Sequence, residues 1–276
     1  MTFIKGDGLQ DDEHRTERNV QFGVREFAMA TVLNGLTLHG GVRVFGGTFF
    51  VFSDYLKAAL RLSALQNLPV TYVFTHDSIA VGEDGPTHEP IEHLASLRTI
   101  PNTYVFRPAD ATEAQAAWYL SQKTNDKPTS IVLTRQNLPI LENSSFEKVA
   151  KGAYVVHETA SDFDTILIAT GSEVALAIDV ARELEKDGSK VRVVSMPSVE
   201  LFEEQSKEYK EELLPLNIRR RVSLEMGNSA LWYKYVGLDG LAIGIDKFGA
   251  SAPANKVIEE YGFTVEAVVE KIKNEL

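Results

Sequence analysis

The chain has 276 residues, contains no cysteine and carries a formal net charge of −11 at pH 7. This length exceeds what a typical single hydrophobic core supports, so two domains are expected. Without cysteine there is no disulfide framework, thiolate-bound metal or thiol nucleophile, which suits a cytoplasmic protein. The acidic balance argues against nucleic-acid binding, and no apolar run is long enough to span a membrane.

The first half of the chain alternates short apolar runs with helical patterns. Strands are expected at Val20–Val24, Val42–Phe45, Pro69–Phe74, Thr103–Phe106 and Ser130–Leu133, and helices at Glu26–Leu38, Ser53–Leu65, Ile91–Leu97 and Ala111–Gln122. The run PVTYVF is continuously apolar, which is typical of a strand covered on both faces. This alternation predicts a parallel sheet flanked by helices.

The alternation stops at Asn137–Gly152, where a proline and a polar cluster predict a linker. It then restarts, with strands expected at Thr165–Thr170, Lys190–Ser195, Arg221–Glu225 and Leu241–Ile243, and helices at Gly171–Asp187, Ala254–Tyr261 and Thr264–Lys273. Ser172 is a plausible N-cap for the first of these helices. The sequence therefore predicts an α/β protein of two domains with mainly parallel sheets, divided as 1–140, a linker at 141–152, and 153–276.

The segment THDSIAVGEDGPTHEP, Thr75–Pro90, is the most unusual part of the chain, and we call it the polar loop. A connecting loop does not need the two histidines, His76 and His88, that flank Asp84 in it. The histidines and acids lack the short fixed spacings of a zinc site, so no metal ligand is expected. Proton transfer and hydrogen bonding to a sugar suit these side chains better.

Glu26 and Arg135 each follow an expected strand, at the edge where α/β sheets bind ligands. Glu26 has a simpler interpretation as an acid in the first turn of a helix, favoured by the helix dipole. Arg135 is either a surface residue or a fork for a phosphate. The residues alone favour the simpler interpretation of Glu26.

Phe49, Phe52 and Tyr55 are spaced to share one face of a helix, and we call them the aromatic wall. Core packing is the simpler interpretation, and the residues alone favour it. The alternative is a surface on which a flat heterocycle stacks. The preceding Gly46-Gly47-Thr48 would let the backbone approach such a ligand closely.

The motifs FGVREFAM, GGTFFVFSDY, THDSIAVGEDGPTHEP, RPAD and LTRQNLP, in this order, resemble the C-terminal half of transketolase. The resemblance continues through ATGSEV, GIDKFGAS and EYGFT, so it covers nearly the whole chain. It implies a pyrimidine-binding α/β domain followed by a smaller C-terminal α/β domain. It also implies transfer of a two-carbon ketol unit from a ketose phosphate to an aldose phosphate, with thiamine diphosphate as cofactor.

The resemblance assigns a role to each candidate residue and reverses the simpler interpretations above. Glu26 matches the catalytic glutamate that hydrogen-bonds the aminopyrimidine ring, and the aromatic wall matches the residues around that ring, with Phe52 stacked on it. Asp84 matches an acid that binds a substrate hydroxyl, and His88 matches a catalytic histidine near the reacting oxygen. His76 and Arg135 match the pair that holds the substrate phosphate.

A full transketolase begins with a diphosphate-binding domain that this chain lacks, and the resemblance places the Mg²⁺ or Ca²⁺ ligands there. Gly6-Asp7-Gly8 and Asn34 have roughly the spacing of the magnesium motif, but the polar residues after them predict a surface turn. We therefore expect the isolated chain to be inactive and to require a diphosphate-binding domain or subunit. We also expect it to form a homodimer through its pyrimidine-binding and C-terminal domains. Both a split subunit and a piece of a longer chain fit.

Three alternatives remain open at this point. A 2-oxoacid dehydrogenase beta chain has a similar length and domain pair, but an enzyme that acts on a 2-oxoacid does not require residues that bind a sugar phosphate. A deoxyxylulose phosphate synthase is a nearer enzyme alternative. A non-catalytic dimerisation module could keep the fold and lose the site, although Glu26, both histidines and Arg135 are all present.

Overall fold

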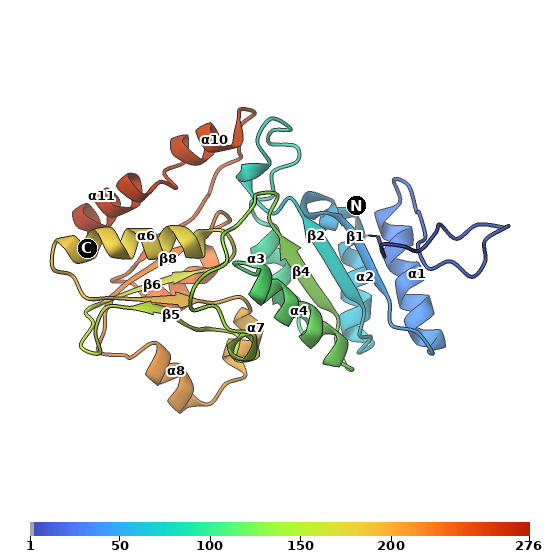
Figure 1. The fold of residues 1–276 in the computed structure, drawn as a ribbon, viewed down its shortest axis with the longest axis horizontal. Coiled ribbons are helices and arrows are strands. Elements are labelled where there is room, and N and C mark those ends of the chain that lie inside the picture. The colour runs from blue at the N-terminus through green and yellow to red at the C-terminus, as the bar shows by residue number, and fades with distance from the viewer. Residues whose placement is uncertain (1–2) are drawn as a thin grey trace.

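The computed structural model describes residues 3–276, which form two α/β domains side by side (Figure 1). The sheet of the first domain is wholly parallel, in the order β1 (Phe45–Phe49), β2 (Thr71–Thr75), β4 (Thr129–Leu133) and β3 (Tyr104–Phe106). Its helices are α1 (Glu26–His39), α2 (Ser53–Leu65), α3 (His93–Arg98) and α4 (Ala111–Lys123), with single 3-10 turns at Phe50–Phe52 and Ile79–Val81. The central strands β2 and β4 are buried except at their last residues, as expected for strands covered on both faces.

The second domain has a mixed sheet in the order β5 (Tyr154–Glu158), β7 (Val191–Ser195), β6 (Thr165–Ala169), β8 (Arg220–Leu224) and β9 (Leu241–Ile243). Only the pairing of β5 with β7 is antiparallel. The longer helices α6 (Glu173–Lys186) and α11 (Val265–Glu275) lie on one side of this sheet, and α8 (Lys207–Leu213) lies on the other (Figure 1). The short helices are α5 (Phe146–Val149), α7 (Val199–Glu203), α9 (Tyr233–Val236) and α10 (Ala254–Glu260), with a 3-10 turn at Ala230–Trp232.

One hydrophobic core crosses the boundary between the domains. Ala116 and Ile131 of the first domain belong to the same buried cluster as Tyr154, Leu167 and Val174 of the second. Burial of apolar surface stabilises by about 25 cal/mol per Å², so this shared core couples the domains energetically. The α/β class with mainly parallel sheets is confirmed.

Several expected elements are wrong or displaced. Val20–Val24 forms no strand within residues 3–276, and Val24 is 93% exposed. An apolar run predicts burial but does not supply the hydrogen-bond partner that a strand needs. The strand expected at Val42–Phe45 begins only at Phe45, and Gly46, Gly47 and Thr48 lie inside it.

The glycine at position 46 has a packing role that the sequence does not show. A Cβ atom there would lie 2.6 Å from Leu33 Cδ1 and 3.3 Å from Met29 Sδ. Gly46 therefore allows α1 to pack closely on β1, and the close approach of the Gly46-Gly47-Thr48 backbone to a ligand stays a prediction. Ser172 is also not a side-chain cap, because its hydroxyl donates to Glu173 Oε1 at 2.6 Å instead of bonding the helix backbone.

The sequence pattern does not predict four elements of the structure, which are β5, α7, α8 and α9. Strand β5 pairs antiparallel at the sheet edge and alternates buried with less buried residues, so it lacks the apolar run that marks its neighbours. The three helices are short, and helix periodicity is hard to recognise over one or two turns. The expected linker also contains the short helix α5. Within residues 3–276, no helix combines the length and apolar character needed to cross a bilayer.

Candidate active site

The candidate site lies where the strands of the first sheet end. Phe49 at the end of β1 is in register with Thr75 at the end of β2, and Thr75 is in register with Leu133 at the end of β4. The carboxyl ends of parallel strands meet at one edge, where ligands of α/β proteins bind. This register brings the segments that carry Phe52, His76 and Arg135 to that edge.

The aromatic wall and both histidines form one continuous cluster. The His76 ring stacks on Phe49 with centroids 3.7 Å apart and planes 21° apart. Phe49 is nearly parallel to Phe52, with centroids 6.1 Å apart. Phe52 in turn contacts Tyr55 at 6.0 Å and the edge of His88 at 5.5 Å. These five rings therefore line one surface.

The aromatic wall is not one helical face. Phe49 ends β1, Phe52 ends the 3-10 turn and Tyr55 lies in the first turn of α2. The chain passes from strand to helix through this turn. The wall is therefore presented at the sheet edge and is only partly buried, with Tyr55 66% exposed. Simple core packing, the interpretation that the residues alone favoured, does not describe it.

Each histidine is oriented by the threonine that precedes it. Thr75 Oγ1 lies 2.9 Å from His76 Nδ1, and Thr87 Oγ1 lies 2.8 Å from His88 Nδ1. Engaging Nδ1 fixes the ring and leaves Nε2 as the nitrogen for other partners. The repeated Thr-His pair in the polar loop is a local sequence signal of this arrangement.

His76 has an unusual backbone. Its φ of 62° lies in the left-handed region, which non-glycine residues adopt rarely and at a cost of roughly 1–3 kcal/mol. The neighbouring Asp77 is fixed by an ion pair with Arg107, with 2.8 Å between Asp77 Oδ2 and Arg107 Nε. The stack on Phe49 and the ion pair of Asp77 therefore both stabilise this unusual backbone conformation of His76.

Electrostatics connect His76 to Arg135 and Asp84. Burial lowers the pKa of His76, the positive charge of Arg135 lowers it further, and the charges of Asp84 and Asp77 offset part of this effect. Arg135 and Asp84 thus both lie within electrostatic range of His76. At neutral pH a lowered pKa keeps the His76 ring uncharged.

Replacing Arg135 with glutamine is expected to raise the pKa of His76, because one of the influences that lower it is removed. Titration of the imidazole carbon-bound protons by NMR measures this change in the isolated chain. Arg43→Gln is the control, since Arg43 bonds the Thr124 carbonyl and is absent from the influences on His76. If the pKa of His76 is the same in Arg135→Gln as in the wild type, Arg135 does not act on His76 and its place in the site is contradicted.

Glu26 is the first residue of α1 and is half-buried. Among residues 3–25 no strand precedes it, so the expectation that Glu26 follows a strand at Val20–Val24 is wrong. Residues 40–44 return the chain directly from α1 to the start of β1, so the beginning of α1 lies towards the carboxyl end of β1. Within the described chain no hydrogen bond of the structure engages the Glu26 carboxylate, and the helix terminus favours its negative charge.

The polar loop is held from behind by the C-terminal domain. Gly82, with φ of 84°, packs so closely on the chain at Ala252 and Ala254 that a Cβ would lie 3.1 Å from Ala254 N. The Ser251 hydroxyl donates to the Glu83 carbonyl at 2.6 Å. Exposed residues of the loop are confined to its tip around Asp84, so packing against the C-terminal domain supports the rest of the loop.

A buried ion network joins the domains directly behind the site. Arg107, which is fully buried, pairs with Asp77 and with Glu173 of α6 and donates to the Thr170 carbonyl at 3.0 Å. Burial opposes the Arg107 charge, but the charges of Glu173 and Asp77 outweigh it and raise the pKa of Arg107. The RPAD and ATGSEV motifs therefore meet in one structural network.

A second buried pair reinforces the same boundary. Arg98 of α3 forms two hydrogen bonds to Glu225, at 2.7 and 2.8 Å, and Trp232 Nε1 donates to the same carboxylate at 3.0 Å. Burial alone would raise the pKa of Glu225, but the Arg98 charge and its hydrogen bonds lower it to about 2. These residues carried no sequence signal, because the pattern does not show which acids become buried.

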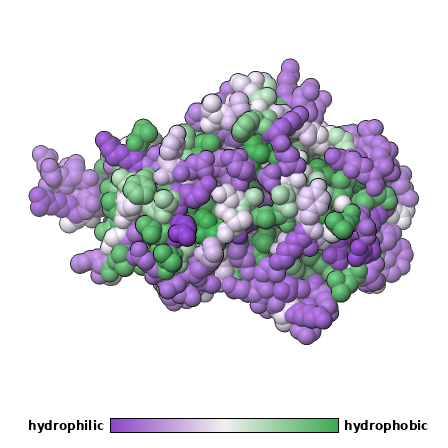
Figure 2. All heavy atoms as spheres, turned by 180° about the vertical axis from the view of Figure 1, so that it is seen from behind, coloured by the Kyte–Doolittle hydropathy of each residue, from purple (hydrophilic) through white to green (hydrophobic). Residues whose placement is uncertain are grey.

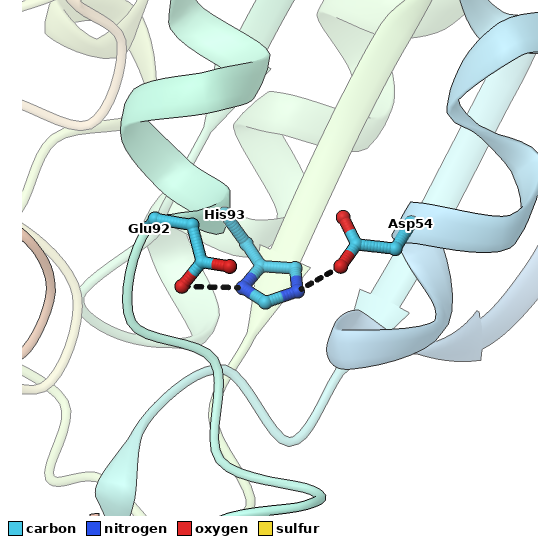
Figure 3. Close-up of side chains that lie close together, drawn as sticks. All are labelled: Asp54, Glu92 and His93. Atoms are coloured by element: carbon cyan, nitrogen blue, oxygen red, sulfur yellow. Dashed lines mark ion pairs between the residues drawn. The ribbon is translucent and has the colours of Figure 1, made fainter. Parts of the chain in front are cut away.

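Asp54, Glu92 and His93 form a second cluster with the residue types of a metal site (Figure 3). The His93 ring lies between the carboxylates, with Nε2 3.2 Å from Asp54 Oδ2 and Nδ1 3.9 Å from Glu92 Oε2. One ligand atom from each of the three residues lies within 4.8 Å of the other two. The Lys57 ammonium is 2.9 Å from Asp54 Oδ1 and already balances its charge. Within the described chain neither His93 ring nitrogen has a well-formed hydrogen bond, so the imidazole lies close to both acids without hydrogen-bonding either.

The expected surface turn at Gly6-Asp7-Gly8 is present. Asp7 pairs with Arg18, whereas Asn34 is buried in α1 and donates to the Ala59 carbonyl at 2.9 Å. Neither side chain is oriented for a shared ion. By contrast, the aromatic wall and the half-buried Glu26 fit the pyrimidine ring of thiamine diphosphate, which needs a flat apolar surface and a carboxylate.

Comparisons with known proteins identify the family of both domains. Residues 2–140 match the family model described as transketolase, pyrimidine binding domain, and residues 152–264 match the transketolase-like TK C-terminal domain. A probable transketolase of Streptococcus pneumoniae is 69% identical over 274 residues, which cover 99% of this chain and 42% of that protein.

Solved structures show the same relation. A transketolase of Pichia stipitis in complex with sedoheptulose-7-phosphate is 41% identical with a TM-score of 0.94, covering 99% of this chain and 40% of that one. A chain described as a split gene transketolase, inactive beta4 tetramer, shares the fold at 24% identity, with a TM-score of 0.76, 93% coverage of this chain and 83% of that one. The chain thus spans less than half of its full-length relatives and belongs to the transketolase family, with the pyrimidine-binding and C-terminal domains of that family.

Proposed function

We propose that this chain supplies one wall of the active site of a transketolase, which transfers a two-carbon ketol unit from a ketose phosphate to an aldose phosphate. The observation that carries the proposal is the continuous surface of His76, Phe49, Phe52 and His88 at the sheet edge. The division into residues 1–140, a linker at 141–152 and residues 153–276, and a cytoplasmic location, are parts of the same proposal.

The aromatic wall and Glu26 are proposed to hold the pyrimidine ring of thiamine diphosphate. Bound there, the cofactor supplies the carbanion chemistry that ketol transfer requires. Phe52, supported by Phe49 and Tyr55, stacks on the ring and excludes water from it. Glu26 holds a proton on its carboxyl oxygen against a ring nitrogen and so sets the protonation state of the ring.

The polar loop and Arg135 are proposed to bind the sugar phosphate. Arg135 provides a planar fork that suits phosphate oxygens, and His76 donates beside it from an uncharged ring. The exposed carboxylate of Asp84 accepts a hydrogen bond from a substrate hydroxyl. His88, fixed through Nδ1, presents Nε2 to the reacting oxygen and moves a proton there.

The rest of the site is proposed to come from partners. The chain spans 42% of the pneumococcal relative, and we assign the Mg²⁺ or Ca²⁺ and the diphosphate to a diphosphate-binding domain or subunit. The split gene chain shows that this fold also exists as a separate polypeptide.

An apolar surface beside Glu26 supports a homodimer through these domains. Figure 2 shows apolar surface next to the projecting hydrophilic N-terminal segment. Between residues 20 and 38, the exposed large apolar side chains are Val20, Val24, Phe27, Val32, Leu36 and Leu38. Exposed apolar side chains gathered on one element support an interaction site there. Because Glu26 begins the same helix, the pyrimidine site would be completed at this contact.

Reconstitution tests the proposal. The isolated chain with thiamine diphosphate and Mg²⁺ is expected to show no ketol transfer, whereas adding the separately produced diphosphate-binding region of the pneumococcal relative is expected to produce turnover. The assay couples ketose phosphate consumption to aldose phosphate formation, and native mass measurement checks association. The diphosphate-binding region alone is the control. Substantial turnover by the isolated chain, or a stable complex without turnover, would contradict the proposal.

A further inference from the structure

The residue after His88 in the polar loop is a buried acid. The Glu89 side chain is 2% exposed and lies against the turn Phe248-Gly249-Ala250 of the C-terminal domain. A Cβ atom on Gly249 would lie 1.7 Å from Glu89 Oε2, so only glycine leaves room for the carboxyl group. This contact joins the loop that carries His88 to the other domain.

The Glu89 carboxyl group has no partner that would balance a negative charge. Within the described chain neither of its oxygens has a well-formed hydrogen bond, although the N–H groups of Gly82 and Ala250 face it. No lysine, arginine or histidine of residues 3–276 forms an ion pair with it in the structure. A buried ionised carboxylate without a partner is far more costly than a neutral carboxyl group.

The surroundings of Glu89 favour the protonated form. Burial raises the pKa of Glu89 to about 7, against a smaller lowering by the Gly82 and Ala250 N–H groups. Tyr261, which follows α10, lies within electrostatic range of Glu89. Burial raises the pKa of Tyr261, and the negative charge of Glu89 raises it further.

The other charged groups around this contact lie farther out. The Lys247 ammonium lies over the Tyr261 ring, 4.5 Å from its centroid, and the Tyr261 hydroxyl donates to the Phe248 carbonyl at 2.7 Å. Glu83 and Asp84 at the loop tip and Glu92 before α3 are exposed. Of these groups, only Lys247 has a positive charge that would favour the ionised form of Glu89. Its ammonium lies over the Tyr261 ring and forms no ion pair with Glu89 in the described chain.

We propose that Glu89 is a positioning residue for His88 that acts as an uncharged carboxyl group and holds the polar loop against the Phe248–Ala250 turn. Loss of its proton leaves an unpaired charge in the contact, which is relieved when the carboxylate moves toward water. That movement displaces the adjacent His88, whose ring contacts Phe52. The polar loop therefore loosens as the pH rises through the pKa of Glu89. The consequence for catalysis rests on the proposed function, whereas the loosening does not.

Hydrogen exchange of the isolated chain tests the loosening directly. The Gly85 and His88 amides bond the Gly82 and Gly85 carbonyls, each at 2.9 Å, and report loop closure. Between pH 6 and pH 8, corrected for intrinsic exchange, their protection in the wild type is expected to fall roughly tenfold, because one pH unit above the pKa leaves about a tenth of the groups protonated.

Matched variants identify the group. Glu89→Gln has nearly the same shape and no charge, so it is expected to keep the loop protected at both pH values. Glu83→Gln removes an exposed charge from the same loop and is expected to behave like the wild type. A wild type that does not respond to pH, a Glu89→Gln chain that responds equally, or a Glu89→Gln loop that is open at both pH values would each overturn the proposal.

Kinetics of the reconstituted enzyme test the link to His88. The kcat/KM of the wild type is expected to contain a decline centred near pH 7 that is absent from Glu89→Gln, with similar values for both at pH 6. A purely structural role would lower the activity of Glu89→Gln equally at all pH values. If reconstitution gives no activity, the proposed function fails, while the exchange experiment still decides the role of Glu89.

Discussion

Replacing Arg107 with methionine is expected to lower the free energy of unfolding by about 3–5 kcal/mol. The substitution keeps most of the side-chain volume but removes the guanidinium group that pairs with Asp77 and Glu173. Both acids have side chains only 1% exposed, so each is left as a buried charge without its partner. Urea unfolding followed by circular dichroism measures the change.

A surface ion pair provides the matched control for Arg107. Arg182 pairs with Asp179 one turn earlier in α6, and both side chains are more than half exposed. Arg182→Met removes the same chemical group and is expected to cost only about 0.2–1 kcal/mol. Equal costs for the two variants would show that the buried network contributes no more than a surface pair.

Substituting Glu26 with glutamine is expected to lower kcat of the reconstituted enzyme by roughly 10²–10⁴-fold, the usual effect of removing a group that transfers a proton. Glutamine keeps the shape of the side chain but cannot hold a proton against a ring nitrogen. The fold should tolerate the change, because Glu26 is half-buried in the first turn of α1, where an acid contributes about 0.3–1 kcal/mol.

The control for Glu26 is Glu13→Gln, an exposed acid in the N-terminal segment, which is expected to retain wild-type kcat. Circular dichroism and the unfolding midpoint verify that both variants are folded. Glu26→Gln turnover within a few-fold of wild type would remove Glu26 from the catalytic machinery and leave it the structural role that its position in the first helical turn suggests.

The long, regular elements were predictable from the sequence. The helices at Ser53–Leu65 and Ala111–Lys123 and the buried strands β2 and β4 agree with the expected positions within two residues. Their periodicity extends over several turns or forms a continuous apolar run. The strand expected at Val20–Val24 is wrong because that run has no partner strand among the described residues. Strand β5 was not predicted because it is an edge strand with an alternating burial pattern.

The candidate residues can be named from the sequence, whereas the contacts that hold them in place cannot. His76, Asp84, His88 and Arg135 stand out by type and by position after expected strands. Arg107 and Glu225 do not stand out, because a charged residue carries no local mark of burial. Burial depends on contacts between residues far apart in the chain, such as Arg98 with Glu225, and these exist only in the folded molecule.

The sequence by itself determined the α/β class, the family and the chemical types gathered in the polar loop, since periodicity and motifs are local properties. Only the tertiary structure decided how these residues are held. Strand register places Phe49 beside Thr75, the C-terminal domain supports the polar loop through Ser251, and burial makes Glu89 a weak acid with a pKa of about 7. Each of these depends on long-range packing, which creates a low-dielectric environment that no local pattern encodes.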